Sequence, residues 1–236
     1  MNAQQLYEQG RLSEAIQVLG GNLRQDPTLV RERTFLFELL CFAGEFDRAE
    51  KQLDLIAQTS REAEMGALLY RSALHAERTR QQLFLDNRAA SGSPAPERLS
   101  GTLNGEPFSS ISDADPRIGA RLEVYAAGQY TWIPFAQIAS VTAPLPQRLR
   151  DLLWIPAVVR PGESFTRAEL GEVLVPATTP LAWRSSDEEV RLGRVTDWEE
   201  LPDGTVVPIG QKLLRVDDEL VPILEVRELV INSPEA

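Results

Sequence analysis

A spacing of 34 residues repeats near the start of the chain and limits what this part can fold into. Four small or apolar residues recur in the same order, each 34 positions later: Gly10, Leu12, Ala15 and Leu19, then Gly44, Phe46, Ala49 and Leu53. A 34-residue period is typical of the tetratricopeptide unit, a pair of helices joined by a tight turn. The period therefore predicts two stacked helical hairpins.

The residue types suit those positions. Glycine at 10 and 44 permits a left-handed backbone where one helix ends and the next begins. Ala15 and Ala49 allow two helices to approach closely, and Pro27 is expected to stop the helix before it.

A fifth helix is predicted over residues 61–85, where Met65, Leu68 and Leu69 recur with helical spacing. We expect it to cap the stack, because terminal repeats need one polar face. Two repeats are fewer than a solenoid usually needs, so the array should lean on the rest of the chain. The predicted helical domain covers residues 1–88.

The pattern changes after residue 88. Residues 89–101 are rich in Gly, Ser, Pro and Ala and are predicted to be a linker or loop. Residues 102–236 are expected to form a compact, mostly antiparallel β domain with short helices, which makes the fold class α+β. Asn104-Gly105 predicts one hairpin and a turn near Gly128 predicts a second.

Later elements are less regular. We predict a short helix within residues 145–154 and another that begins at Ser185 or Ser186, where acidic residues suit the first turn. Residues 210–231 are interpreted as two strands around the acidic turn at Asp217.

The net charge of −11 argues against nonspecific nucleic-acid binding, and most of the excess acid lies after residue 90. This acidity favours basic partners or simply keeps the protein soluble. We expect neither a membrane span nor a secretory signal. The single cysteine, Cys41, fits a reducing compartment, so the expected location is the cytoplasm.

The sequence offers little catalytic chemistry. His75 is the only histidine, and no Cys or His partner lies at metal-ligand spacing from it. No phosphate loop or nucleophile elbow is present. We therefore predict a non-enzyme with no catalytic, cofactor-binding or metal-binding residues. A carboxylate-dependent hydrolase stays open as an alternative, with these candidate acids: Asp197, Glu199, Glu200, Asp217 and Asp218.

Several motifs together resemble the ImpE/SciE/TagJ family. They occur in order along nearly the whole chain: "LFELLCFAGEFDRAEKQLDLIA", "WIPF", "LRDLLW", "LGEVLVPA", "VRLGRVTDW" and "GQKLL". The resemblance implies a cytoplasmic accessory protein of a bacterial type VI secretion system. It implies binding to the small contractile-sheath subunit through a helix near that subunit's N-terminus, with an indirect link to the disassembly ATPase. No catalytic residues come with it.

Helical-repeat surfaces can take an amphipathic partner helix in a groove. Two sets of residues are candidates for partner binding. The first is Arg33, Phe35 and Phe37 in the second repeat. The second is Trp132, Phe135 and Trp154 in the β domain. Core packing is the competing explanation for both sets, and a general tetratricopeptide-like scaffold for another partner is the competing function.

Overall fold

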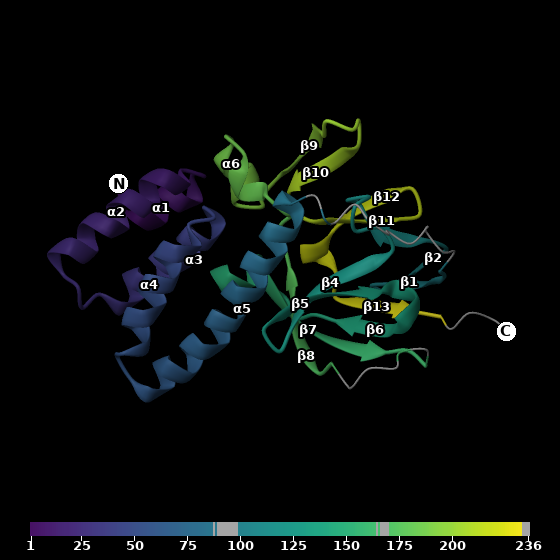
Figure 1. The fold of residues 1–236 in the computed structure, drawn as a ribbon, viewed down its shortest axis with the longest axis horizontal. Coiled ribbons are helices and arrows are strands. Elements are labelled where there is room, and N and C mark those ends of the chain that lie inside the picture. Colours follow the sequence, from purple (N-terminus) through teal and green to yellow (C-terminus); the bar gives the residue numbers. More distant parts are fainter. Residues whose placement is uncertain (87, 89–98, 164, 166–169, 233–236) are drawn as a thin grey trace.

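The computed structural model describes residues 1–86, 88, 99–163, 165 and 170–232. A helical part comes first and a β-rich part follows, as Figure 1 shows, so the predicted α+β class is confirmed. Residues 89–98 of the predicted linker lie outside the described residues. The division into domains at 1–88 and 102–236 therefore stays a prediction.

The described residues of the helical part form five helices, each packed against the next along the chain. They are α1 (Ala3–Glu8), α2 (Leu12–Gln25), α3 (Val30–Phe42), α4 (Phe46–Ala57) and α5 (Arg61–Leu85). The helix before Pro27 ends at Gln25, and α5 begins after Ser60, whose hydroxyl accepts a hydrogen bond from Ala63 N at 3.1 Å.

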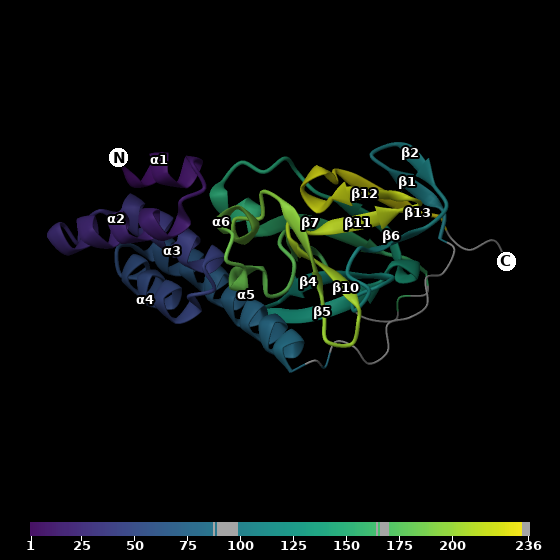
Figure 2. The same cartoon turned by 90° about the horizontal axis from the view of Figure 1, so that it is seen from above.

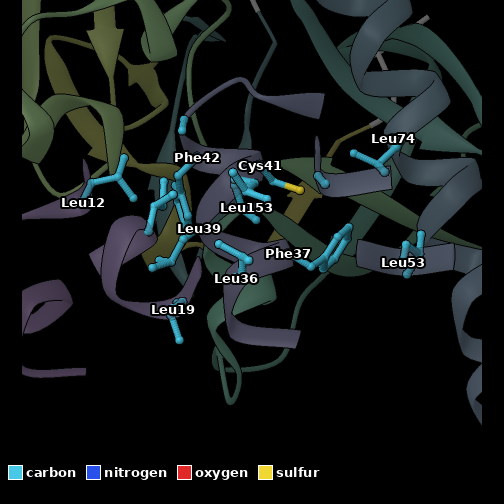
Figure 3. Close-up of a cluster of buried hydrophobic side chains, with 14 of the residues drawn as sticks. Leu12, Leu19, Leu36, Phe37, Leu39, Cys41, Phe42, Leu53, Leu74 and Leu153 are labelled. Atoms are coloured by element: carbon cyan, nitrogen blue, oxygen red, sulfur yellow. The ribbon is translucent and has the colours of Figure 1, made fainter. Parts of the chain in front are cut away.

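The repeated residues occupy the positions predicted for them. Gly10 and Gly44 lie between helices with φ angles of 75° and 70°, in the left-handed region that favours glycine. Ala15, Ala49, Leu19 and Leu53 are at most 1% exposed. Figure 3 shows Leu19 and Leu53 in one buried cluster with Leu153, which comes from the β-rich part. The helical array and the β-rich part therefore share a core.

The prediction that α5 closes the stack with a polar outer face is wrong for the first half of this helix. Met65, Leu68 and Leu69 are 70%, 65% and 58% exposed, so an apolar strip faces outward there. The second half of α5 packs against β5 of the sheet and is covered by it. The long helix thus joins the array to the sheet instead of closing the stack.

The β-rich part holds one eight-stranded sheet and two smaller ones, and every ladder among the described residues is antiparallel. The main sheet has the order β2-β1-β13-β6-β7-β8-β4-β5. Its strands are β1 (Gly101–Leu103), β2 (Glu106–Phe108), β4 (Arg121–Ala126), β5 (Gln129–Pro134), β6 (Ile138–Thr142), β7 (Trp154–Pro161), β8 (Glu172–Pro176) and β13 (Glu228–Ile231).

The smaller sheets flank the main one. One contains β3 (Ile111–Asp113), β11 (Leu213–Val216) and β12 (Glu219–Pro222). The other is a two-stranded ribbon of β9 (Thr196–Glu200) and β10 (Val206–Gly210), which Figure 1 shows beside the short helix α6 (Glu188–Arg191) and beyond the main sheet. Figure 2 shows the helical array at one end of the molecule and the sheets at the other.

Both predicted hairpins are present. Asn104 and Gly105 join β1 to β2 with φ angles of 52° and 90°, and Ala127 and Gly128 join β4 to β5 with φ angles of 48° and 77°. Positive φ at both central residues is what the tight hairpin turn requires.

Three predictions on later elements need correction. The helix expected in residues 145–154 is one 3₁₀ turn, Leu149–Leu152. The helix expected from Ser185 or Ser186 starts instead after Asp187, whose side chain accepts from Glu189 N at 2.8 Å, and ends after four residues. The C-terminal run forms three strands, β11, β12 and β13, not two. No helix among the described residues is long and apolar enough to cross a membrane.

Candidate functional site

A buried ion pair lies where α5 meets the sheet. Arg80 of α5 donates from Nε and Nη2 to the two carboxylate oxygens of Glu123 on β4, both at 2.9 Å. Its Nη2 also donates to Thr178 O at 2.9 Å. Neither side chain has any exposed surface. Two parallel bonds between a guanidinium and a carboxylate fix the relative orientation of their elements.

A second cation completes this cluster. Lys212 Nζ donates to Glu123 Oε2 at 2.6 Å and forms a further ion pair with Asp113. Burial, partly offset by Lys212, raises the pKa of Asp113 to about 6. Burial also acts to raise the pKa of Glu123. The positive charges of Arg80 and Lys212 outweigh this effect and hold the pKa of Glu123 below its usual value. Two cations therefore balance two acids inside the protein.

Glu77 extends the cluster toward the helical array. Its carboxylate accepts from Tyr125 OH at 2.5 Å, from Trp154 Nε1 at 3.0 Å and from Arg80 at 3.4 Å. Burial, followed by the nearby charge of Glu77, raises the pKa of Tyr125. These groups are all buried. The arrangement joins α5 to β4 and β7 (Figure 1), and it presents no catalytic group to solvent.

Two residues of the second predicted partner-binding set, Trp132 and Trp154, lie next to this cluster. Trp154 is 3% exposed and bonds to Glu77. Phe135 has no exposed surface and belongs to the core of the sheet. Trp132 is half-buried, lies under the guanidinium of Arg121 at 3.8 Å from the ring centre, and donates to Tyr130 OH. Only Trp132 reaches the surface.

The first set is divided in the same way. Arg33 is buried and donates to Gln52 Oε1 at 2.8 Å and to Pro27 O at 2.7 Å, so it joins α3 to α4 and to the preceding loop. Phe37 is 1% exposed. Phe35 is half-buried with its ring edge-to-face with Tyr7. Phe35 and Phe37 share one hydrophobic cluster with Trp154 of the second set, whereas Phe135 belongs to the core of the sheet. A direct role for any of the six in partner binding stays a prediction.

The Arg80–Glu123–Lys212 cluster was not predicted from the sequence. On β4, Arg121, Glu123 and Tyr125 alternate with Leu122 and Val124. Such alternation is typical of a strand with one face in solvent. Here α5 covers the polar face. An available signal was the row of tyrosine, tryptophan and glutamate on one face of β4 and β5, where Glu123 pairs with Trp132 and Tyr125 pairs with Tyr130.

Residues 183–189 of the β-rich part also pack against the two hairpin turns of the helical array. Trp183 packs against Gly44, where a methyl group in place of the glycine hydrogen would lie 2.6 Å from the indole. Glu189 packs against Gly10 in the same way. Each hairpin turn of the array thus contacts one side chain of residues 183–189.

Two charged side chains in and just after this segment, Glu188 and Arg194, bind the ends of two helices. Glu188 Oε1 accepts from Ser13 N at 3.0 Å, at the start of α2. Arg194 Nη2 donates to Tyr7 O at 2.5 Å, at the end of α1. An acid near a helix N-terminus and a cation near a C-terminus both complement the helix dipole and its unpaired backbone groups.

The acids proposed for a hydrolase do not form a site of the expected kind. Asp197, Glu199 and Glu200 lie exposed on the ribbon strand β9, whereas Asp217 and Asp218 lie at the β11–β12 turn. Hydrogen bonds from Ser109 and Ser110 lower the pKa of Asp217, opposite to what a general acid needs. Among the described residues no group of three or more His, Cys, Asp or Glu side chains could hold a metal ion.

Comparisons with known proteins agree over most of the chain. Residues 105–230 match the model of the family described as ImpE protein. The sequence is 29% identical to the type VI secretion system accessory component TagJ of Pseudomonas aeruginosa, over 100% of this chain and 93% of that protein. The fold is similar to the crystal structure of protein VPA1032 from Vibrio parahaemolyticus, with a TM-score of 0.84, 22% identity, and coverage of 98% of this chain and 97% of that one.

Proposed function

Because this chain belongs to the ImpE family, we propose that it is an accessory component of a type VI secretion system and binds the small subunit of the contractile sheath. The observation that carries the proposal is the similarity to TagJ along the whole chain. The partner element would be the helix near the N-terminus of that subunit. Through it, the protein would influence how the disassembly ATPase handles the sheath.

The geometry supports binding without chemistry. The array of α1 to α5 offers helix faces for an amphipathic partner, and such recognition needs no reactive group. The buried cluster of Arg80, Glu123 and Lys212 is enclosed and its charges pair with one another, which suits a structural role. We therefore propose a cytoplasmic non-enzyme.

The helical and β-rich parts are proposed to act as one unit in binding. Arg80, Glu123 and Lys212 join them in the interior, and residues 183–189 contact both turns of the array. A partner surface that spans the two parts would keep a fixed shape. This distinguishes the proposal from a general scaffold in which the helical array binds on its own.

Binding of the purified full-length protein to the small sheath subunit from the same genome tests the proposal. We expect isothermal titration calorimetry to detect a complex, and we expect it to vanish when the N-terminal helix of the subunit is deleted. Equal binding to the truncated subunit, or no binding to either sheath subunit, would contradict the proposal.

The half-buried residues of the two predicted sets locate the contact. Phe35→Ala and Trp132→Ala each remove an aromatic ring that reaches the surface in a different part of the molecule. We expect one of the two variants to weaken binding at least tenfold, on the order of a hot-spot residue. Circular dichroism controls for folding. Unchanged affinity in both folded variants would remove both sets as contact surfaces.

A further inference from the structure

The ribbon of β9 and β10 is the least supported part of the sheet structure. Among the described residues β9 pairs only with β10, and β10 contacts α6 and the 3₁₀ turn Ala182–Arg184. Two-stranded hairpins are marginal in water by themselves. Two apolar side chains of the ribbon are exposed to solvent: Trp198 is 42% exposed and Val206 is 50% exposed. Single exposed apolar side chains are ordinary on protein surfaces, so other features of the ribbon must decide whether it is an interaction surface.

The ribbon is also strongly acidic. Residues 195–211 include four carboxylates and no Lys, Arg or His. Two of these acids have local partners: Asp197 accepts from Trp198 N at 2.8 Å and Asp203 accepts from Thr205 N at 2.9 Å. Within the described part of the chain, the side chains of Glu199 and Glu200 have neither a hydrogen bond nor an ion pair. Their charges are available to a partner.

A groove of about 570 Å³ separates the ribbon from the end of α5. Apolar side chains in it come from Phe84, Leu181 and Ile209, and Trp198 and Glu199 line the ribbon side. Asp197 lies on the ribbon side as well, and Arg117 and the exposed Arg184 line other parts of the groove. Arg117 is already paired with Asp115 at 2.6 Å, so its charge is compensated. The groove is large enough for apolar side chains of a peptide but not for a whole domain.

We propose that this face docks a lysine- or arginine-rich segment of a partner protein. An apolar side chain of the segment would enter the groove between the ribbon and α5, while its cations would pair with Glu199 and Glu200 and lie against the indole of Trp198. Tryptophan is among the residues that contribute most at interfaces, and it attracts cations through its ring face. Complementary charge would also speed the encounter.

This inference is independent of the sheath-binding proposal, because it depends on the chemistry of the ribbon alone. The test uses the full-length protein and a fluorescein-labelled synthetic peptide of alternating lysine and leucine. A peptide of the same length with glutamate in place of lysine is the control. We expect fluorescence anisotropy to show binding of the lysine peptide only, and weaker binding as salt is added, because salt screens exposed charges.

Two matched double variants localise the binding. Glu199→Gln with Glu200→Gln removes two charges from the ribbon, and Asp218→Asn with Glu219→Gln removes two exposed charges from the neighbouring β11–β12 turn. We expect the ribbon variant to bind the lysine peptide about tenfold more weakly and the control variant to change less than about twofold. Trp198→Ala should weaken binding as well, because the exposed indole is lost.

Either of two results would overturn the inference. If both double variants weaken binding to the same extent, only the net charge of the protein attracts the peptide. If the ribbon variant binds as the wild type does, the ribbon is not the site. All substituted side chains are exposed, so each variant is expected to fold, and circular dichroism checks this.

Discussion

Single residues carry the connection between the two parts of this protein. Glu123 lies on a sheet strand, yet its partner Arg80 comes from a helix and its partner Lys212 from the residue just before β11. All three are at most 1% exposed. In such a cluster each charge depends on the others, because no water can replace a missing partner.

Glu123→Gln is therefore expected to be strongly destabilising. As carboxylate partners it leaves Arg80 with only the longer contact to Glu77 and Lys212 with only Asp113, and breaking a buried pair costs about 3–5 kcal/mol. Urea denaturation followed by circular dichroism measures the change in the free energy of unfolding. Asp54→Asn is the control, because it breaks the exposed pair with Arg71 and should cost at most about 1 kcal/mol. Equal losses in the two variants would contradict the role assigned to Glu123.

Two glycines of the helical array should respond to alanine in opposite directions. Gly44 has a φ of 70° and its added methyl would meet Trp183, so Gly44→Ala should destabilise by more than about 1 kcal/mol. Gly20 lies inside α2 with nothing within 4 Å of an added methyl, so Gly20→Ala should stabilise by about 0.5–1 kcal/mol. Thermal denaturation of both variants measures the difference, and a shift in the same direction for both would count against it.

At the scale of elements, the packing of α3 against the 3₁₀ turn Leu149–Leu152 makes stability depend on pH. Burial raises the pKa of Glu38 on α3 to about 7, although the positive charge of Arg150 favours the ionised carboxylate and so opposes the shift. An unfolded glutamate titrates near 4.3. Between these values the folded state binds more protons, so the free energy of unfolding falls as pH rises toward and through 7.

Glu38→Gln should reduce this dependence. We expect the melting temperature of the wild type to rise when the pH is lowered from about 8 to about 5.5, with a smaller rise in the variant and a higher melting temperature for the variant at pH 8. Asp113, whose pKa is raised to about 6, keeps part of the dependence in both proteins. Glu64→Gln, on the exposed face of α5, is the control. A variant with the full wild-type dependence would refute this account.

Local signals predicted elements well where a single residue type decided the conformation. Asn104-Gly105 located one hairpin, and Gly10 and Gly44 located the turns of the array. Prediction failed where packing decides. The run after Ser185 carries helical signals, but it forms four helical residues and then β9, because β9 pairs with β10. Trp154 was a candidate for partner contact, but Glu77, 77 residues away, holds its indole inside. No local pattern contains that pairing.

The whole molecule should unfold as one unit. The cluster in Figure 3 combines Leu53 of the array with Leu153 of the β-rich part, and α5 belongs to both. A shared core and a buried charge cluster couple the two parts, and coupled parts lose structure together.

Two probes follow the two parts separately. Circular dichroism at 222 nm reports mainly on the helices, and tryptophan fluorescence reports on Trp132, Trp154, Trp183 and Trp198, which all lie in the β-rich part. We expect coincident urea transitions for the wild type. In Glu123→Gln the two curves should separate, because the joint between the parts is weakened. Separate transitions in the wild type would show that the parts are independent.

The contacts of Trp183 and Glu189 with the two hairpin turns also set a limit on evolution by duplication. Open-ended solenoids gain length by copying one repeat, since each repeat needs only its neighbours. Here a copied hairpin would displace a turn from the side chain that matches it. The β-rich part therefore fits an array with two hairpin turns. A lineage can lengthen the array only if residues 183–189 change at the same time.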